Sequence, residues 1–300
     1  MIRAARRGVI VCPVCGAPLD ADERTLRCGR RHAFDRAREG YCHLAPAGHG
    51  KTAMRGDTRE MLRARRRIFE RGFYAPLAEA LAERILREPI SPGFTVLDAG
   101  CGEGYYIGHV SRALAEHVPD AACCSIGVDV SKDGLKLAAR AHHDVCFVVN
   151  DVTHRLTVAD RCVDVLLDVF APRNAAEFAR VVKRGGLLVV VIPHARHLEE
   201  LRERLPLLGI EPEKRERVIA RLGEAFRLEA ERALDYRRAL DAEDVRDLIG
   251  MTPSAWHLDT ADIEPVQSWQ RTEVTFAMRL LAFRRGRDAS DTFFGREHGV

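Results

Sequence analysis

The sequence predicts an α/β fold, in which a doubly wound parallel sheet follows a small metal-binding module. Three observations support this prediction. Short apolar runs alternate with helical patterns between residues 93 and 285, a glycine-rich turn directly follows the first of these runs, and four cysteine and histidine residues lie close together before residue 33. Alternating strands and helices are typical of parallel sheets whose ligands bind at the carboxyl ends of the strands.

The chain of 300 residues is long enough for one large domain and a smaller module. No apolar run approaches the roughly 20 residues of a membrane helix, and the first residues lack the apolar core of a signal peptide. We therefore expect a cytoplasmic protein without membrane contact. Residues 1–71 hold 17 Lys and Arg but 8 Asp and Glu, a net charge of +9, whereas the rest of the chain carries −6. This asymmetry predicts a front module that binds a polyanion, and a solvated surface in an arginine-rich sequence is the alternative.

Residues 1–50 form the predicted metal-binding module. Cys12 and Cys15 make a C-x2-C pair, and Cys28 and His32 follow about a dozen residues later. Four such donors at this spacing are typical of a closed, structural zinc site. The alternative, a redox C-x-x-C pair, lacks the βαβ context that it requires.

Other residues of the module refine this prediction. We expect a positive φ at Gly16 and Gly29, which stand just after a cysteine in each half. Cys42 is a less suitable metal ligand because it lies ten residues past His32. Arginines interleaved with aromatic rings suit a folded RNA, through phosphate pairing and base stacking; these are Arg24, Arg27, Arg30 and Arg31 with Phe34, Tyr41 and His43.

Residues 51–92 are predicted to form a linker followed by two helices. The first helix starts at Asp57 or Thr58, either of which can cap it, and the second spans about 77–87, after a break at Gly72. A run of arginines covers the first helix as a solvated face or as a continuation of the RNA surface: Arg63, Arg65, Arg66 and Arg67.

Residues 93–285 are predicted to form the main domain. Strands are expected at 94–98, 125–129, 145–149, 163–169 and 187–192, with helices at 105–117, 132–142 and 174–183. We also expect a charged helical insertion at about 196–248, a closing strand at 273–283 and a flexible tail at 286–300.

The turn after the first strand carries the main functional signal. Gly100, Gly102 and Gly104 make the turn, and Asp98 precedes them where a carboxylate would repel a bound phosphate. Asp129 ends the next strand, at the place of a ribose-binding carboxylate. The predicted ligand is therefore a nucleoside without a pyrophosphate. The turn resembles the first motif of class I S-adenosylmethionine-dependent methyltransferases, D/E-x-G-x-G-x-G, and so implies their Rossmann-like sheet.

Further polar residues follow the other strands. Asn150 and Asp151 end the third strand, and we expect them beside the adenine. The alternatives are a turn at these two residues and a helix cap at Asp129. The loop at 170–174 follows the fourth strand and would face the methyl group, as a wall for a target base.

Taken together, the motifs resemble the bacterial 23S rRNA (guanine-N1)-methyltransferases that modify hairpin 35 of the large-subunit RNA. The resemblance covers nearly the whole chain and rests on motifs at 12–41, 63–77, 98–105, 170–172, 196–198 and 251–253. Segments 170–174 and 254–259 look more like the branch associated with macrolide (tylosin-type) resistance. The chain departs from the family at Cys42 and His43, where Val and Asn are usual.

That resemblance implies a set of site residues and partners. Tyr74, Gly102, Glu103 and His197 would contact S-adenosylmethionine. Zn2+ would bind to Cys12, Cys15, Cys28 and His32, and the partner would be 23S rRNA. A homodimer is compatible with these expectations.

The reaction requires guanine N1 to lose a proton as it attacks the methyl group. A general base, or donors to the developing charge on O6, should line the pocket. Asp168 is a candidate base, with a structural hydrogen bond as the alternative, and Arg173 and Asn174 are candidates to hold the guanine edge. Two rival functions remain, a methyltransferase acting on a small molecule or a protein, and a non-catalytic zinc-dependent RNA-binding protein.

Overall fold

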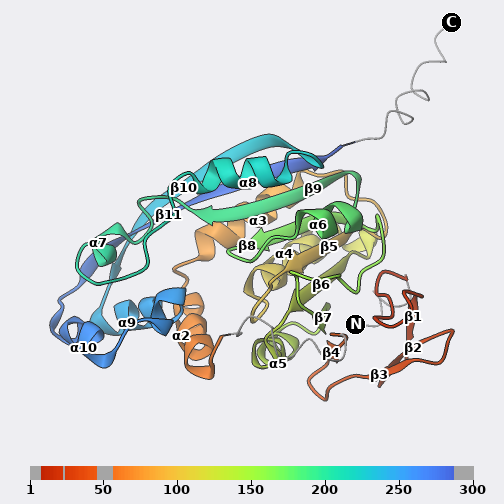
Figure 1. Ribbon diagram of the computed structural model, residues 1–300, viewed down its shortest axis with the longest axis horizontal. Helices are drawn as coiled ribbons and strands as arrows, with labels where there is room; N and C mark the ends of the chain where they lie inside the picture. Colours follow the sequence, from red (N-terminus) through yellow and green to blue (C-terminus); the bar gives the residue numbers. More distant parts are fainter. Residues whose placement is uncertain (1–7, 23, 46–56, 287–300) are drawn as a thin grey trace, which may run out of the picture.

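An eight-stranded mixed sheet with helices on both faces forms the centre of the molecule (Figure 1). The computed structural model describes residues 8–22, 24–45 and 57–286. Most of the predicted linker before the first helix, and nearly all of the predicted tail, lie outside the described residues. Among the residues that are described, no helix is long and apolar enough to cross a membrane.

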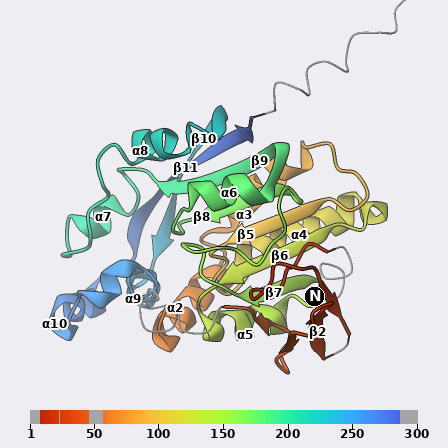
Figure 2. The same cartoon turned by 45° about the vertical axis from the view of Figure 1, so that its right-hand side comes forward.

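The sheet has one continuous strand order. From one edge to the other its strands are β10 (Phe226–Leu240), β11 (Thr272–Arg285), β9 (Val182–Pro193), β8 (Val163–Val169), β5 (Thr95–Ala99), β6 (Cys124–Asp129), β7 (Val145–Val149) and β4 (Cys42–His43). Strands β9 to β4 are parallel, and β11 is antiparallel to both of its neighbours. The chain leaves β5 toward β6 first and reaches β8 on the other side later, as the strand order in Figure 2 shows. Ligands of such sheets bind at the carboxyl end of the strand where the order reverses, which here is β5.

Helices cover the two faces of the sheet. One apolar cluster joins the sheet to α2 (Arg59–Glu70), α3 (Ala75–Leu86), α4 (Tyr105–His117), α5 (Lys132–Ala141) and α9 (Ala242–Gly250), and the other joins it to α6 (Ala175–Val181) and α8 (Lys214–Leu222). Strand β5 contributes Val96 to the first cluster and Leu97 to the second. This alternation follows from the two-residue period of a strand. The predicted strands and helices from 94 to 183 are confirmed within a few residues.

The N-terminal ribbon packs against the second face of the sheet. Its strands β1 (Leu19–Ala21), β2 (Thr25–Cys28) and β3 (Ala33–Asp35) are antiparallel. The Val11 N–H donates to the Thr157 carbonyl at 3.0 Å, and the side chain of Ile10 is fully buried in the second apolar cluster. The ribbon therefore shares a core with the sheet.

The segment after the ribbon extends the sheet by one strand. Cys42 and His43 pair in parallel with Val148 and Val149 of β7. The Cys42 thiol is fully buried and lies 3.6 Å from the Asp35 carbonyl, outside the cysteine and histidine cluster of the ribbon. Its alternative role as a metal ligand is therefore wrong.

The predicted helical insertion at 196–248 is wrong for residues 226–240. This segment is β10, which pairs with β11 from Phe226 opposite Arg285 to Leu240 opposite Thr272. Its Ala, Leu, Glu and Arg residues favour a helix, but pairing along a whole neighbouring strand overrides that propensity. The helices of this segment are α7 (Glu199–Arg202), α8 and most of α9, with loops between them.

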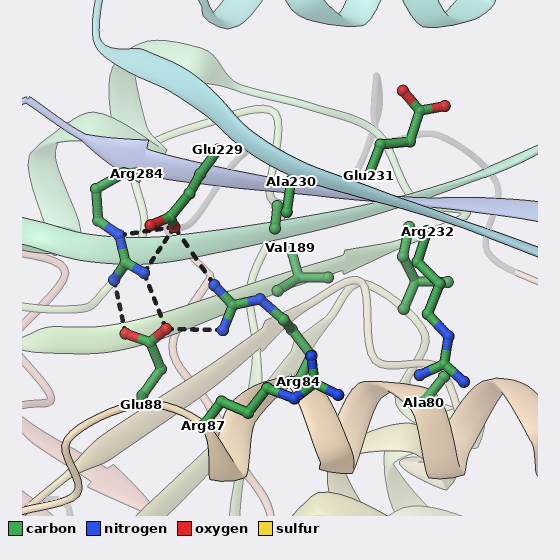
Figure 3. Close-up of a pocket in the computed structure, with 12 residues that line it drawn as sticks. Ala80, Arg84, Arg87, Glu88, Val189, Glu229, Ala230, Glu231, Arg232 and Arg284 are labelled. Carbon is green, nitrogen blue, oxygen red and sulfur yellow. Dashed lines mark hydrogen bonds and ion pairs between the residues drawn. The ribbon is translucent and has the colours of Figure 1, made fainter.

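A cavity of about 430 Å³ between α3 and strands β9 to β11 contains a network of ion pairs (Figure 3). Glu88 accepts hydrogen bonds from Arg284 at 2.6 and 2.9 Å and from Arg84 at 2.7 Å, and Arg284 also binds Glu229 at 2.7 Å. Burial raises the pKa of Glu88, but the hydrogen bonds from the two arginines outweigh burial and lower it. The network connects the end of α3 to the β10–β11 hairpin.

We expect Glu88→Gln to lower the free energy of unfolding by about 1–3 kcal/mol at neutral pH, because two partly buried arginines would lose a shared carboxylate. The pKa of Glu88 is lower in the folded state than its usual value of 4.5, so its contribution is present above that value and is lost in acid. The difference between wild type and variant should therefore shrink as the pH falls below that value. Urea denaturation at neutral and acidic pH would measure it.

The exposed pair of Glu83 and Arg232, at 2.6 Å, offers a matched control. Glu83→Gln should change stability by less than about 0.5 kcal/mol, because exposed ion pairs contribute little. Equal losses in the two variants would contradict the proposed contribution of Glu88.

Candidate active site

The glycine-rich turn between β5 and α4 borders a cavity of about 760 Å³. Gly100 and Gly104 have φ of 88° and 80°, in the region that favours glycine. A Cβ at Gly100 would lie 2.5 Å from the Ala171 Cβ, and one at Gly104 would lie 2.9 Å from Cζ of Phe147. The turn therefore needs glycine for space as well as for conformation, and Gly100 brings it against the loop that follows β8.

Asp129 at the end of β6 faces the same cavity. Its carboxylate accepts hydrogen bonds from the Gly102 N–H at 2.8 Å and the Ser131 N–H at 2.7 Å. The N-cap of α5 is Ser131, whose hydroxyl accepts from the Gly134 N–H, so the alternative interpretation of Asp129 as a helix cap is wrong. Burial raises the pKa of Asp129, and the two backbone donors oppose this effect.

Two buried carboxyl groups of the turn have oxygens without hydrogen-bond partners among the described residues. Both oxygens of Asp98 are of this kind, and so is Oε1 of Glu103. The other Glu103 oxygen accepts from Arg66 at 3.2 Å. Burial, with repulsion from Asp129 and Asp168, raises the pKa of Asp98 to about 8. Glu103 lines the cavity, so its unpaired oxygen indicates that a ligand with ammonium or hydroxyl groups completes the site.

Arg65 also lines this cavity, although its place in the arginine run predicted a solvated or RNA-facing side chain. Its guanidinium pairs with Asp57, donates to the Met251 carbonyl at 3.2 Å, and lies 3.4 Å from the position of a Cβ on Gly102. Arg65 is therefore the cation of α2 that is available to a carboxylate beside the turn. The signal that could have found it is the helical spacing of the three α2 residues that line the cavity, which are Met61, Arg65 and Phe69.

The rest of the arginine run mostly makes contacts within the chain. Arg66 binds Glu103, and Arg67 binds both oxygens of Asp247 at 2.6 Å, whereas Arg63 is exposed. The prediction of one solvated or RNA-facing surface for this run is therefore wrong for Arg65, which lines the cavity, whereas Arg67 is exposed although it pairs with Asp247.

His197 and Tyr74 form a buried pair in the wall of the cavity. The Ala277 N–H donates to His197 Nδ1 at 3.2 Å, which places the ring proton on Nε2, 3.4 Å from the Tyr74 hydroxyl. Burial, with repulsion from Arg202, lowers the pKa of His197 to about 3. The imidazole is therefore neutral at physiological pH.

The loop after β8 contains the residues predicted for catalysis. Arg173 lines the cavity, and its Nε lies 2.8 Å from the fully buried Asp168 carboxylate. Asp168 also accepts from the Ala171 N–H at 3.3 Å, and burial raises its pKa to about 7 although Arg173 opposes the shift. The Asn174 side chain caps α6 and donates to the Thr153 carbonyl at 3.0 Å.

The structure brings most of the predicted site residues to one cavity. Those that line it are Tyr74, Gly100, Gly102, Glu103, Asp129, Asp151, Arg173 and His197. Those that do not are Asp98, Gly104, Asn150, Asp168 and Asn174. Asp151 also forms the predicted turn, because its carboxylate accepts from the Thr153 N–H at 2.9 Å, whereas Asn150 is buried with its amide 3.5 Å from the Thr157 hydroxyl.

The predicted zinc ligands form a separate cluster in the ribbon. The donor atoms of Cys12, Cys15, Cys28 and His32 all lie within 4.8 Å of one another. The sulfurs of Cys15 and Cys28 are 3.8 Å apart, and Cys28 Sγ lies 3.3 Å from His32 Nδ1. A tetrahedral zinc with Zn–S bonds of about 2.3 Å places two sulfurs about 3.8 Å apart, so the donor set fits zinc.

The two ribbon turns have different conformations. The prediction of a positive φ is confirmed at Gly16, with 70°, but Gly29 is not among the residues of positive φ. In the second turn Arg31 has this conformation instead, with φ of 68°, and its N–H donates to the Cys28 carbonyl at 2.9 Å.

Comparison with known proteins agrees with this arrangement. A family model described as "RlmA, N-terminal" matches residues 10–52, and one described as "Methyltransferase domain" matches 96–186. A Micromonospora griseorubida protein provisionally named as a 23S rRNA (guanine-N(1)-)-methyltransferase is 40% identical over 298 residues, which cover 91% of this chain and 96% of the relative. The chain belongs to the 23S rRNA (guanine-N1)-methyltransferase family.

Two further relatives extend the comparison within this methyltransferase family. The 23S rRNA (guanine(748)-N(1))-methyltransferase of Streptomyces fradiae is 37% identical, over 84% of this chain and 87% of that protein. A Bacillus subtilis (strain 168) protein, also provisionally named as a 23S rRNA (guanine-N(1)-)-methyltransferase, is 33% identical, over 90% of this chain and 95% of that protein. As in the methyltransferase family, the methyl donor is S-adenosylmethionine, and the metal of the ribbon is zinc.

The residues of the cavity fit S-adenosylmethionine. Acidic side chains at the turn and at the end of β6 suit its hydroxyl and ammonium groups, and Arg65 suits its carboxylate. When bound, S-adenosylmethionine would supply an electrophilic methyl group, and the residues of the turn after β5 would hold the cofactor.

We expect Arg65→Gln to weaken S-adenosylmethionine binding by about tenfold or more, because a charge-assisted pair with the cofactor carboxylate would be removed. Decarboxylated S-adenosylmethionine should bind to wild type and variant equally. Calorimetric titration of both ligands would measure the difference. Arg63→Gln, on the exposed side of the same helix, is the control and should leave both affinities unchanged. Equal weakening of both ligands by Arg65→Gln would assign Arg65 a structural role only.

We expect Cys15→Ser to remove bound zinc and to lower the melting temperature of the whole chain, because the ribbon and the sheet share one core. Elemental analysis and scanning calorimetry would measure the two effects. Cys162→Ser is the control, since Cys162 lies outside the metal cluster. A full zinc content in Cys15→Ser would contradict the assignment.

Proposed function

We propose that this protein transfers a methyl group from S-adenosylmethionine to N1 of a guanine in hairpin 35 of 23S rRNA. The observation that carries the proposal is the single cavity shared by the cofactor turn and the loop after β8. The identity of 37% to the Streptomyces fradiae enzyme favours a guanine of the 748 type and a contribution to macrolide resistance. A cytoplasmic location follows from this substrate, and the predicted homodimer stays a prediction.

In this proposal the cavity would hold a target base next to the methyl group. Gly100 and Ala171 are in close contact, so Phe170 and Arg173 line the same space as Gly102 and Asp129. Methyl transfer needs an in-line approach at about 3 Å, and the acceleration then comes mainly from positioning. A guanine held by this loop would meet that requirement.

Arg173 is the residue that we assign to the guanine edge. Arg173 lines the cavity, and a guanidinium suits the O6 atom, which gains charge as N1 loses its proton. Asp168 is buried behind Arg173 and does not line the cavity, so we assign it the positioning of that guanidinium instead of direct proton abstraction. Asn174 would act in the same indirect way, by fixing the start of α6.

The N-terminal ribbon supplies the contacts to RNA phosphates in this proposal. Its four predicted arginines, which are Arg24, Arg27, Arg30 and Arg31, are all exposed. Exposed cations on a module of a base-modifying protein suit RNA, because phosphate contacts position a nucleic acid for recognition of its bases. A small-molecule methyltransferase would not need this surface.

Primer extension through hairpin 35 tests the proposal. Purified protein, S-adenosylmethionine and unmodified large-subunit rRNA should give a stop at a single guanine, because N1 methylation blocks Watson–Crick pairing. Protein without cofactor is the control. The absence of a stop, with cofactor binding intact, would contradict the rRNA substrate.

The roles of Asp168 and Arg173 have a distinct kinetic signature. Asp168→Asn should lower kcat by about tenfold to a hundredfold and keep the pH dependence of kcat, because the carboxylate positions Arg173 and is not the base. Arg173→Ala should lower kcat at least as much, and cofactor affinity should be unchanged in both. If Asp168→Asn abolished the dependence of kcat on pH near neutrality, Asp168 would be the general base and our assignment would be wrong.

Arginine substitution is a better test of the ribbon than its deletion, since the ribbon shares a core with the sheet. We expect Arg30→Gln with Arg31→Gln to raise KM for rRNA and to leave kcat unchanged. The plot of log affinity against log salt concentration should also become less steep. Its slope should change by about one unit for each phosphate that the variant no longer neutralises. Methylation assays over a range of salt concentrations would show this. Unchanged KM at every concentration would argue against a phosphate-binding ribbon.

A further inference from the structure

Exposed apolar side chains gather at one place on the described part of the chain. Among the described residues, four large hydrophobic residues are exposed, and three of them, Phe170, Leu208 and Trp256, line the cavity of the cofactor turn, whereas Val14 lies in the ribbon. Phe170, Leu208 and Trp256 are 42%, 49% and 44% exposed. Clustered apolar exposure of this kind indicates a binding surface.

The backbone holds Phe170 in an unusual conformation. Its φ is 55°, in the left-handed region that bulky residues rarely adopt, and its N–H donates to the Val191 carbonyl at 3.2 Å. The ring lies edge-on to Tyr74, with centroids 6.4 Å apart, and stacks on His197 at the same distance. Residues kept in such conformations cluster at functional sites, and here the ring is fixed beside the loop that meets the cofactor turn.

Leu208 and Trp256 belong to a second wall of the cavity. Trp256 ends the short helix η3 (Pro253–Trp256), and the Leu208 N–H donates to the Ser254 hydroxyl at 3.1 Å. This bond ties the loop before α8 to η3, so Leu208 and Trp256 are held on one surface. The two walls come from different elements and can contact two different groups of one ligand.

Cations accompany the apolar residues. Arg173, Arg202 and Lys214 line the same cavity. Burial, with repulsion from Arg173, lowers the pKa of Lys214, which shows that its amino group is partly enclosed next to another cation. Aromatic and aliphatic surfaces with neighbouring cations are what unpaired nucleotides require, namely a stacking partner and a partner for phosphate.

We propose that Trp256 and Leu208 form a stacking surface for the unpaired base next to the target guanine, while Phe170 contacts the guanine itself. This inference rests on the proposed RNA substrate and names how the site holds it. Single-stranded loops are recognised through such splayed bases, and a base-modifying enzyme must hold its target outside the stack. The loop that carries Phe170 adjoins the cofactor turn. The second wall, with Leu208 and Trp256, is therefore available for the neighbouring base.

The tryptophan content of the chain provides a direct test. It contains two tryptophans, and Trp269 lies under the Arg204 guanidinium at 3.3 Å. Trp269→Phe therefore makes Trp256 the single fluorophore. We expect a hairpin RNA with an unpaired loop to quench its emission, and a fully paired duplex of equal length to quench it little, because stacking requires an unpaired base.

Affinity provides a second measurement. Trp256→Ala should weaken binding of the hairpin RNA by about tenfold, Trp256→Phe should restore most of the affinity, and S-adenosylmethionine binding should be unchanged in both. Trp269→Phe is the control, since Trp269 lies outside both the ribbon and the cavity lining.

The outcomes separate this inference from the proposed function. If the wild type methylates rRNA but Trp256 emission does not respond, or if Trp256→Ala binds RNA normally, the stacking surface is wrong and the function stands. If the wild type neither binds nor methylates rRNA, the stacking surface and the proposed function are both wrong. Quenching by free guanosine without RNA binding would assign the surface to a small aromatic acceptor and overturn the proposal.

Discussion

The close approach of the glycine turn to the loop after β8 is the constraint on which the site depends. A Cβ at Gly100 would meet the Ala171 Cβ at 2.5 Å, so any other residue there would push the loop away. The contact brings two strand ends, separated along the chain by the whole of β6 and β7, to one cavity. A cofactor methyl and a target base can meet only if these ends are adjacent. The parallel order of β5 and β8 places them there, and the glycine sets the separation.

The packing of the ribbon against the sheet depends on the metal site. The ribbon is too short for a core of its own, and its apolar residues join those of the sheet in one cluster. The zinc ligands fix the turns that present these residues, and β4 then continues the chain as an edge strand of the sheet. Cys42 and His43 depart from the family pattern at this strand, and the structure explains why the departure is tolerated. The Cys42 side chain fills a buried site, and that of His43 is exposed.

The sequence predicts the parts of this protein that depend on local patterns. The turn at 98–104, the first four strands of the main domain and the four metal ligands follow from spacing and from the chemistry of glycine, cysteine and histidine. The parts that depend on distant partners do not follow from it. Residues 226–240 are a strand because β11 lies beside them, although their own composition favours a helix. Arg65 points into the cavity because Asp57 and the Met251 carbonyl hold it, and Asp168 turns away because Arg173 pairs with it. Sequence position alone cannot indicate which way such side chains point.

The buried acids show why these distant pairings matter for the cofactor site. Asp98 is fully buried beside Asp129 and Asp168, and its pKa of about 8 keeps it largely protonated at neutral pH. Asp168 is equally buried, but the Arg173 guanidinium opposes the rise and its pKa reaches only about 7. Glu103, unlike these two residues, lines the cavity, and its Oε1 has no hydrogen-bond partner among the described residues. A positively charged group brought beside Glu103 would lower the pKa that burial raises. The charge of the turn is therefore set by the ligand as well as by the chain, because a cationic ligand such as S-adenosylmethionine compensates a carboxyl group that the fold leaves partly unpaired.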